Sequence, residues 1–117
     1  MSKIESFKDL IVWQKSMELA LDVYKIASSL PQNEQYGLCS QLKRSAVSIP
    51  SNIAEGHKRG TKEFIHFLKI AYGSSAELET QLLLSQKLFP KITTYHSLEL
   101  VIEIQKILSV FIKKLNS

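Results

Sequence analysis

The chain has 117 residues, a net charge of +4, 44% hydrophobic residues and 22% charged residues. This length is that of one ordinary domain, and this composition excludes an intrinsically disordered chain. Only three prolines and four glycines are present, which favours long regular elements over many turns. We therefore predict a single domain over residues 1–117.

No targeting or membrane-spanning segment is recognisable. The N-terminus, MSKIESFKDL, carries charges every few residues and has no apolar signal core. No window approaches the roughly 18 uninterrupted apolar residues of a membrane span. The single cysteine, Cys39, cannot form an internal disulfide, which suits a reducing compartment. We expect a cytoplasmic protein without membrane association, in which Cys39 is a small apolar side chain.

Apolar residues spaced three and four apart predict a first helix over residues 8–29. Ser6 can cap its start together with Asp9 in a capping box, and Pro31 ends it. The helix carries two neighbouring apolar stripes, one of Leu10, Trp13, Met17, Ala20, Tyr24 and Ala27, the other of Val12, Leu19, Val23, Ile26 and Leu30.

Three more amphipathic helices are predicted, over residues 34–56, 61–89 and 94–115. Asn33 is the expected N-cap of the second helix and Gly56 its expected C-cap. The connections are short, so neighbouring helices should run antiparallel. No segment alternates as a strand does. The sequence predicts an all-α fold, an antiparallel up-down-up-down four-helix bundle.

Pro50 stands inside the second predicted helix. A proline there costs about 3 kcal/mol, through a lost hydrogen bond and a clash with the carbonyl of Ala46. The apolar spacing nevertheless keeps its helical register through Pro50 to Ile53. We therefore predict a continuous, kinked helix. The alternative is a restart, with Pro50 at the first position of a new helix.

Asn52 and Glu55 follow Pro50 on one face of the same helix, with Gly56 after them. They could orient a ligand or an RNA group. They could instead hydrogen-bond the nearby backbone and hold the turn into the third helix. We favour this second interpretation and treat the four residues as a structural motif.

The apolar surface is larger than one bundle needs. The two stripes of the first helix cover about half of its circumference, whereas a bundle helix needs an apolar arc of a little over 100°. Further apolar residues extend or leave the main stripes of the other helices: Leu100, Ile104, Ile107 and Phe111 on the fourth, and Ile65, Tyr72 and Leu83 on the third. Organised apolar patches usually mark a partner surface, so we predict a homo-oligomer.

Nothing in the sequence forms a recognisable catalytic or metal site. Glu63 and His66 make a Glu-x-x-His motif, which di-iron bundles use in pairs, but here it occurs once. The pair also points away from the stripe of Phe64 and Leu78. No nucleophile constellation or glycine-rich phosphate loop is present. We predict a non-enzymatic protein with no catalytic residues, no metal and no cofactor.

The basic residues suggest an acidic partner. The candidate contacts are Lys43, Arg44, Lys58, Arg59 and Lys62. On a lone chain such charges are ordinary solvated surface, but an oligomer would repeat them and strengthen phosphate contacts. Few aromatic residues lie nearby, which favours salt-sensitive binding to an RNA or DNA backbone over reading of bases. The alternative is a protein–protein adaptor for a partner that processes nucleic acid.

The segment SAVSIPSNIAEGHKRG resembles the signature of the 23S rRNA intervening-sequence protein family. FKDLIVWQKSMELALDVYKI, EQYGLCSQLKRSAVSIPSNIAEG and EFIHFLKIAYGSSAELETQL are similar to its first three helices. The resemblance implies a left-handed bundle that assembles as a ring, typically a homopentamer, carrying five times the +4 charge of one chain. It also implies a link to RNA through gene location, a relation to accessory variability-determinant proteins of retroelements, and no enzymatic activity.

Overall fold

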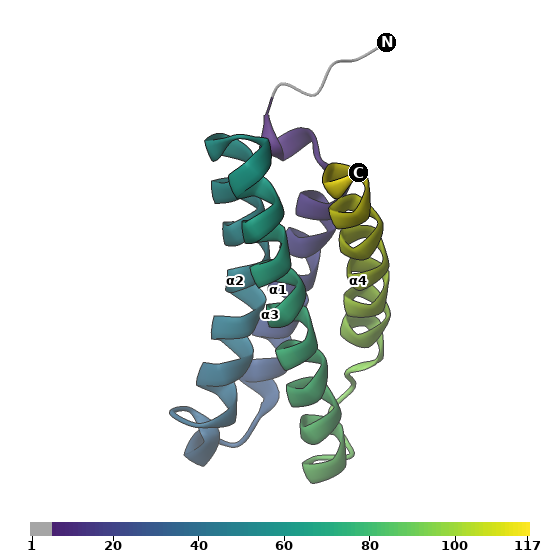
Figure 1. Ribbon diagram of the computed structural model, residues 1–117. Coiled ribbons are helices and arrows are strands. Elements are labelled where there is room, and N and C mark those ends of the chain that lie inside the picture. Colours follow the sequence, from purple (N-terminus) through teal and green to yellow (C-terminus); the bar gives the residue numbers. More distant parts are fainter. Residues whose placement is uncertain (1–5) are drawn as a thin grey trace.

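Four long helices make up the computed structural model, which describes residues 6–117. They are α1 (Ile11–Ser29), α2 (Leu38–Arg59), α3 (Thr61–Leu88) and α4 (Tyr95–Asn116), with short 3-10 helices η1 (Phe7–Asp9) and η2 (Gln32–Glu34). Figure 1 shows η1, the α2–α3 junction and the C-terminus at one end of the molecule. No strand occurs in the described part of the chain, which confirms the all-α prediction.

Each helix packs against the next one in the sequence, and α4 also packs against α1. Two side-chain pairs show the relative direction of α1 and α4. Ser97, near the start of α4, hydrogen-bonds Asp22 in the second half of α1, whereas Glu103, further along α4, forms an ion pair with Lys15 near the start of α1. These two helices are therefore antiparallel. With 28 residues, α3 is about 42 Å long and spans nearly the whole 45 Å length of the molecule.

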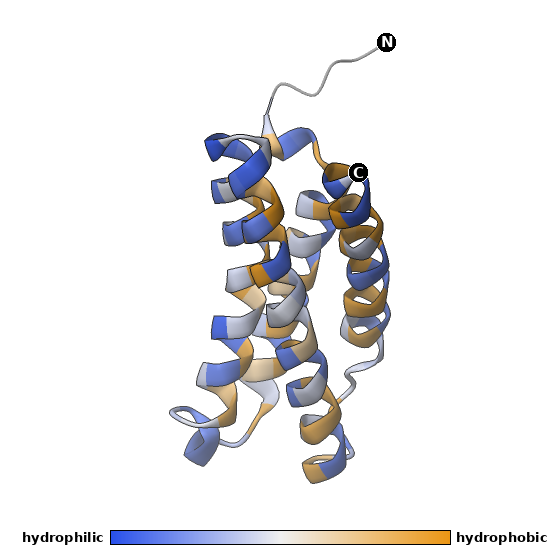
Figure 2. Ribbon diagram, viewed as in Figure 1, coloured by the Kyte–Doolittle hydropathy of each residue, from blue (hydrophilic) through white to orange (hydrophobic). Residues whose placement is uncertain are grey.

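The core draws on all four helices, as the recurring apolar residues in Figure 2 indicate. Its largest fully buried side chains include Leu19, Leu42, Ile49, Ile53, Leu68, Leu78, Leu82, Ile104 and Leu108. On α1 the stripe that contains Val12 and Leu19 faces this core. In the other stripe, Met17 and Tyr24 remain 40% and 45% exposed. One of the two stripes is thus left partly uncovered.

The buried face of α4 includes Val101 and Leu108, as predicted, but it is shifted to one side of the predicted stripe. The apolar spacing of this segment puts Val101, Ile102 and Leu108 in one stripe, and Leu100 and Ile104 extend that stripe to one side. The structure buries Leu100 and Ile104, whereas Ile102 is 42% exposed. Apolar residues surround much of this helix, so periodicity alone leaves its rotation about its own axis undetermined.

The starts of the first two helices also differ from prediction. Ser6 and Asp9 form the predicted capping box, but it caps η1, and α1 begins only at Ile11. The second helix does not begin near Asn33, because η2 and a turn precede α2 there. Gly37, the residue before α2, has φ −110° and ψ −105°, which interrupts helical geometry.

The prediction that Gly56 ends the second helix is wrong. Gly56 is buried inside α2, which continues to Arg59 and ends at Gly60 with φ +112°. A Cβ atom on Gly56 would lie 2.6 Å from Cβ of Phe67 and 3.0 Å from the ring of Phe64. The absence of a side chain at this position lets α3 approach α2 closely.

We expect Gly56→Ala to lower the free energy of unfolding by about 1–3 kcal/mol, because the added methyl group overpacks the contact with Phe67. Urea unfolding followed by circular dichroism measures this change. Gly73→Ala in α3 is the matched control, since apart from its chain neighbours and the adjacent backbone of α3 no atom lies within 4 Å of its Cβ position. That variant should gain up to about 1 kcal/mol from helix propensity. Equal changes in the two variants would contradict the close α2–α3 contact.

Candidate nucleic-acid interface

The segment from Val47 to Phe64 forms the second half of α2 and the start of α3. Pro50 is buried within α2, and the helix continues through it as predicted. A restart at Pro50 is therefore excluded. The missing N–H of Pro50 leaves the carbonyl of Ala46 without its usual helical donor.

Asn52 uses its side chain within the bundle. Its amide nitrogen donates to the carbonyl oxygen of Ser48 at 2.8 Å and lies 3.0 Å from the Ser48 hydroxyl. That hydroxyl is 2.7 Å from the hydroxyl of Ser74 on α3. These bonds agree with a structural role for Asn52. Of these bonds, only the one between Ser48 and Ser74 connects α2 to α3, near the middle of both helices, and none of them holds the turn between the helices.

Glu55 and Arg59 form an ion pair on the last turns of α2. Nη2 of Arg59 donates to Oε2 of Glu55 at 2.7 Å, and both side chains are about half exposed. The Arg59 guanidinium also lies 5.1 Å from the centroid of the Phe67 ring. An exposed pair of this kind adds at most about 1 kcal/mol to stability. Its main effect is to orient Arg59 and to offset part of its charge.

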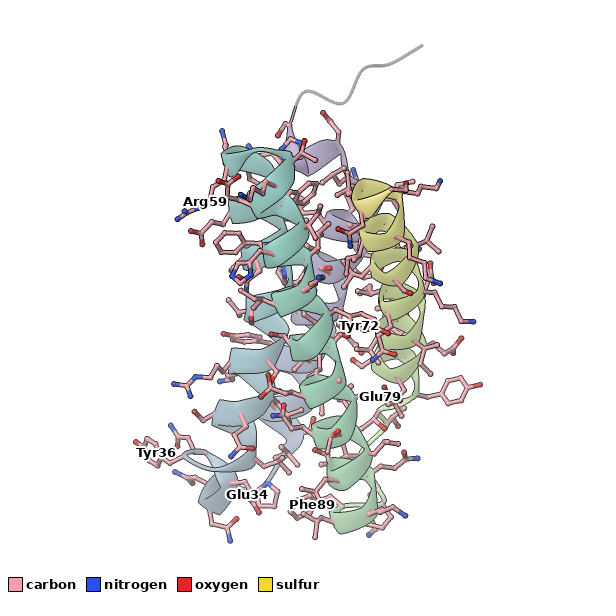
Figure 3. The ribbon with its side chains drawn as sticks, viewed as in Figure 1. Glu34, Tyr36, Arg59, Tyr72, Glu79 and Phe89 are labelled. Carbon is pink, nitrogen blue, oxygen red and sulfur yellow. The ribbon has the colours of Figure 1, made fainter. Side chains whose placement is uncertain are left out.

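The five predicted contact residues separate into two groups. Lys58, Arg59 and Lys62 lie at the α2–α3 junction, where Figure 3 shows Arg59. Lys43 and Arg44 precede them on α2, with Arg44 about 21 Å from Lys58 along the helix. Nζ of Lys43 lies 5.0 Å from the centroid of the Tyr24 ring, a cation–π contact with α1. The five residues therefore do not form one continuous patch.

Three further lysines lie at the same end of the molecule as the junction. Lys8 belongs to η1, and Lys113 and Lys114 belong to the last turn of α4. The rings of Phe64 and Phe111, 5.2 Å apart, join the start of α3 to the end of α4. Figure 1 shows these two helix termini at the same end of the molecule. We call the whole set the basic end: Lys8, Lys58, Arg59, Lys62, Lys113 and Lys114.

Sequence reasoning missed these three lysines because they stand far from Lys58 and Lys62 in the chain. The available signal was the predicted antiparallel order of the helices. That order brings the end of the fourth helix beside the start of the first and the third.

The basic end carries more positive than negative charge. Its acidic residues, half as many as its cations, are Asp9, Glu55 and Glu63. Some of the cations have a local role, because the last turns of α2 and α4 expose carbonyl groups that favour positive charge. Lys58 and Lys62 are exposed, and no ion pair within residues 6–117 engages either of them. Their charges face solvent.

The remaining candidate side chains have ordinary surroundings. Glu63 and His66 are both exposed, and the His57 ring packs edge-on against Phe64 at 5.5 Å. Cys39 is buried, as expected for a small apolar side chain, and its thiol donates to the carbonyl oxygen of Ala27 at 3.3 Å. Across residues 6–117, no three His, Cys, Asp or Glu side chains gather as metal ligands would. None of the described helices combines the length and hydropathy needed to cross a bilayer.

Comparison with known proteins identifies the family. The pattern of the family described as 23S rRNA-intervening sequence protein matches residues 8–115. A crystal structure from Bacteroides thetaiotaomicron, described as a protein with unknown function from the S23 ribosomal protein family, is similar with a TM-score of 0.73. The two sequences are 28% identical, over 88% of this chain and 99% of that one. No curated protein matches the chain. The match covers nearly every described residue, and the chain belongs to the 23S rRNA-intervening sequence protein family.

Proposed function

We propose that this protein is a non-enzymatic oligomer that binds the phosphate backbone of RNA or DNA through its basic end. The observation that carries the proposal is the gathering of six cations from η1, α2, α3 and α4 at one end of the bundle, against three acidic residues. Each phosphate contact releases counterions from the nucleic acid, so binding by such a surface weakens as salt rises.

Lys58 and Lys62 are the strongest candidates for phosphate contacts, because both are exposed and outside the ion pairs described above. Arg59 adds a planar group, although Glu55 offsets part of its charge. Lys43 and Arg44 would extend the contact surface along α2 toward the other end of the molecule. They are therefore secondary contacts.

The basic end offers little for reading bases. Its phenylalanines are buried or half-buried, among them Phe7, Phe64, Phe67 and Phe111. Base recognition on single strands usually needs an exposed aromatic face on which a base can stack. This favours binding that follows the backbone and tolerates many sequences.

Self-association would repeat the basic end. On α1, Met17, Leu21 and Tyr24 form an exposed stripe with 40%, 66% and 45% of each residue accessible. Such a stripe favours contact between copies. We infer an up-down-up-down, left-handed bundle that assembles as a ring, with five copies as the family resemblance implies. Repetition of a weak phosphate site raises overall affinity without new contacts.

The double variant Lys58→Glu/Lys62→Glu should weaken binding to a structured RNA by about tenfold or more. The plot of log affinity against log salt should become less steep, with the magnitude of its slope reduced by about one to two, because two phosphate contacts are lost. Fluorescence anisotropy across a salt series measures both quantities.

The matched control is Lys87→Glu/Lys91→Glu, which changes the net charge equally at the opposite end of the molecule. Lys87 lies in the last turn of α3, and Lys91 lies in the α3–α4 connection. This control should retain most of the affinity. An equal loss in both double variants would indicate a general charge effect and would contradict the assignment to the basic end.

Asn52→Ala should leave RNA affinity unchanged, because the Asn52 amide bonds Ser48 within the bundle. The free energy of unfolding should fall by roughly 1 kcal/mol, the usual contribution of such a hydrogen bond. Chemical denaturation and the same anisotropy titration measure the two effects. A loss of binding with unchanged stability would give Asn52 a direct role in recognition.

Leu21→Glu should shift the protein from an oligomer to a monomer, because it places a charge in the exposed stripe of α1. Its helix content should stay unchanged, since Leu21 is 66% exposed. Sedimentation velocity measures the mass in solution. A monomeric wild-type protein at high concentration would refute the assembly itself.

A further inference from the structure

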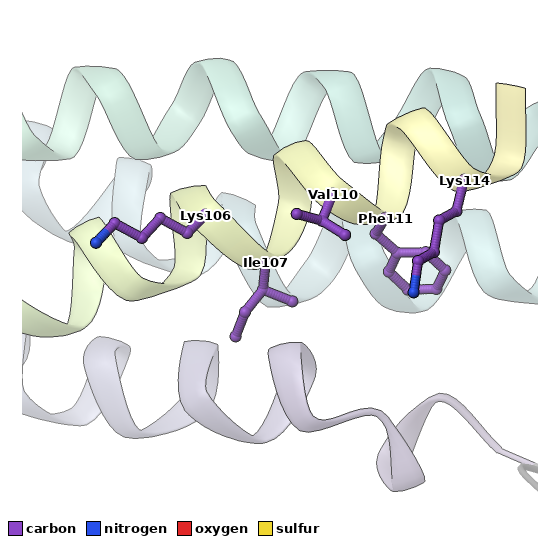
Figure 4. Close-up of a pocket in the computed structure, with 5 residues that line it drawn as sticks. All are labelled: Lys106, Ile107, Val110, Phe111 and Lys114. Carbon is purple, nitrogen blue, oxygen red and sulfur yellow. The ribbon is translucent and has the colours of Figure 1, made fainter.

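A groove whose lining is mainly apolar, unlike that of the basic end, lies on α4 beside α1. It has a volume of about 510 Å³ and is lined by Lys106, Ile107, Val110, Phe111 and Lys114. Figure 4 shows the two lysines at either end of this row, with Ile107 pointing toward α1. The floor is apolar and its two ends are cationic.

Within residues 6–117, the polar pairs that join α1 to α4 lie on the side of the groove that faces away from the basic end. The Asp22 carboxylate accepts from the Ser97 hydroxyl at 2.5 Å, and Lys15 pairs with Glu103. The hydrogen bond that Lys15 donates to Glu103 raises the pKa of the Lys15 ammonium group. By the same antiparallel register, Ile11 lies opposite Ile107, and Ile11 is 63% exposed. Toward the basic end, the surface between the two helices is therefore apolar and uncovered.

The positive charges at the groove have no acidic neighbour in its lining. Among the residues that line it none is acidic, and Glu103, one turn before Ile107, is engaged by Lys15. Lys106 and Lys114 stand eight residues apart on α4, about 12 Å along its axis. An occupant thus meets two cations separated by about two helical turns.

We propose that this groove binds an amphipathic helix of a partner protein with acidic residues on the edges of its apolar face. Apolar anchors on such a helix would cover Ile107 and Val110, in the manner of helix-in-groove recognition. Acidic side chains seven or eight residues apart would meet Lys106 and Lys114. This partner site goes beyond the proposed nucleic-acid binding, although Lys114 belongs to both surfaces.

Two other occupants fit the groove less well. A nucleic acid would find an apolar floor, and the one ring there, Phe111, already packs against Phe64 at 5.2 Å. A second copy that docked through the same groove would bring its own Lys106 and Lys114 against these cations. Charge complementarity therefore selects an acidic helix.

The test uses the full-length protein and two fluorescent peptides of about 18 residues, or five helical turns. Both are amphipathic helices with leucines on one face. One carries glutamates spaced seven or eight residues apart beside the leucines, and the other carries lysines there. Anisotropy should show that the glutamate peptide binds about tenfold more tightly or better.

Val110→Glu should weaken binding of the glutamate peptide by about tenfold, because it places an acidic charge on the apolar floor. The fold should tolerate this change, since Val110 is 52% exposed. Val47→Glu on α2, where the valine is 43% exposed, is the matched control and should bind normally. The double variant Lys106→Glu/Lys114→Glu should reverse the preference and bind the lysine peptide.

Equal binding of the two peptides to the wild-type protein would overturn the proposal, and so would undiminished binding to the Val110→Glu variant. If Val110→Glu instead lowers the mass of the protein in solution, the groove is a contact between copies. If it abolishes RNA binding, the groove is part of the nucleic-acid surface. Both of those results would also overturn the proposal.

Discussion

The direct contact between α2 and α3 organises the rest of the molecule. The two helices are joined by one residue, Gly60, whose φ of +112° is readily adopted only by glycine. A few residues earlier, Gly56 lets Phe64 and Phe67 approach the α2 backbone. Because the connection is so short, α3 must reverse the chain direction directly after α2 and pack against it. That contact fixes where the cations near the junction lie and what the other two helices pack against.

The exposed surface of the bundle has regions that differ in charge and hydrophobicity. Cations from η1, α2, α3 and α4 gather at one end, and a partly exposed apolar stripe runs along α1. The groove beside α4 combines both properties, because lysines bound an apolar floor. The proposed contacts with a nucleic acid, with further copies of the chain and with a helical partner each rest on a different one of these surfaces.

Much of the fold follows from the sequence alone. The four helices and the continuity of α2 through Pro50 were predictable, because apolar spacing records helical register directly. The end of α2 was not, since Gly56 and Gly60 are equally good C-cap candidates until α3 is packed against one of them. The buried face of α4 was not predictable either, because apolar residues surround that helix. The basic end was found in part: Lys58 and Lys62 are close in the chain, whereas Lys8 and Lys113 join them only through tertiary structure.

The single-residue connection at Gly60 also constrains how this architecture can vary. Because no other residue separates the two helices, an insertion there would change the turn at Gly60 and displace the side chains of α3 that pack against α2. The α1–α2 and α3–α4 connections are longer and lie together at the other end of the bundle. We therefore expect changes in chain length to be tolerated mainly at that far end, where they would leave the junction that carries Lys58 and Lys62 in place.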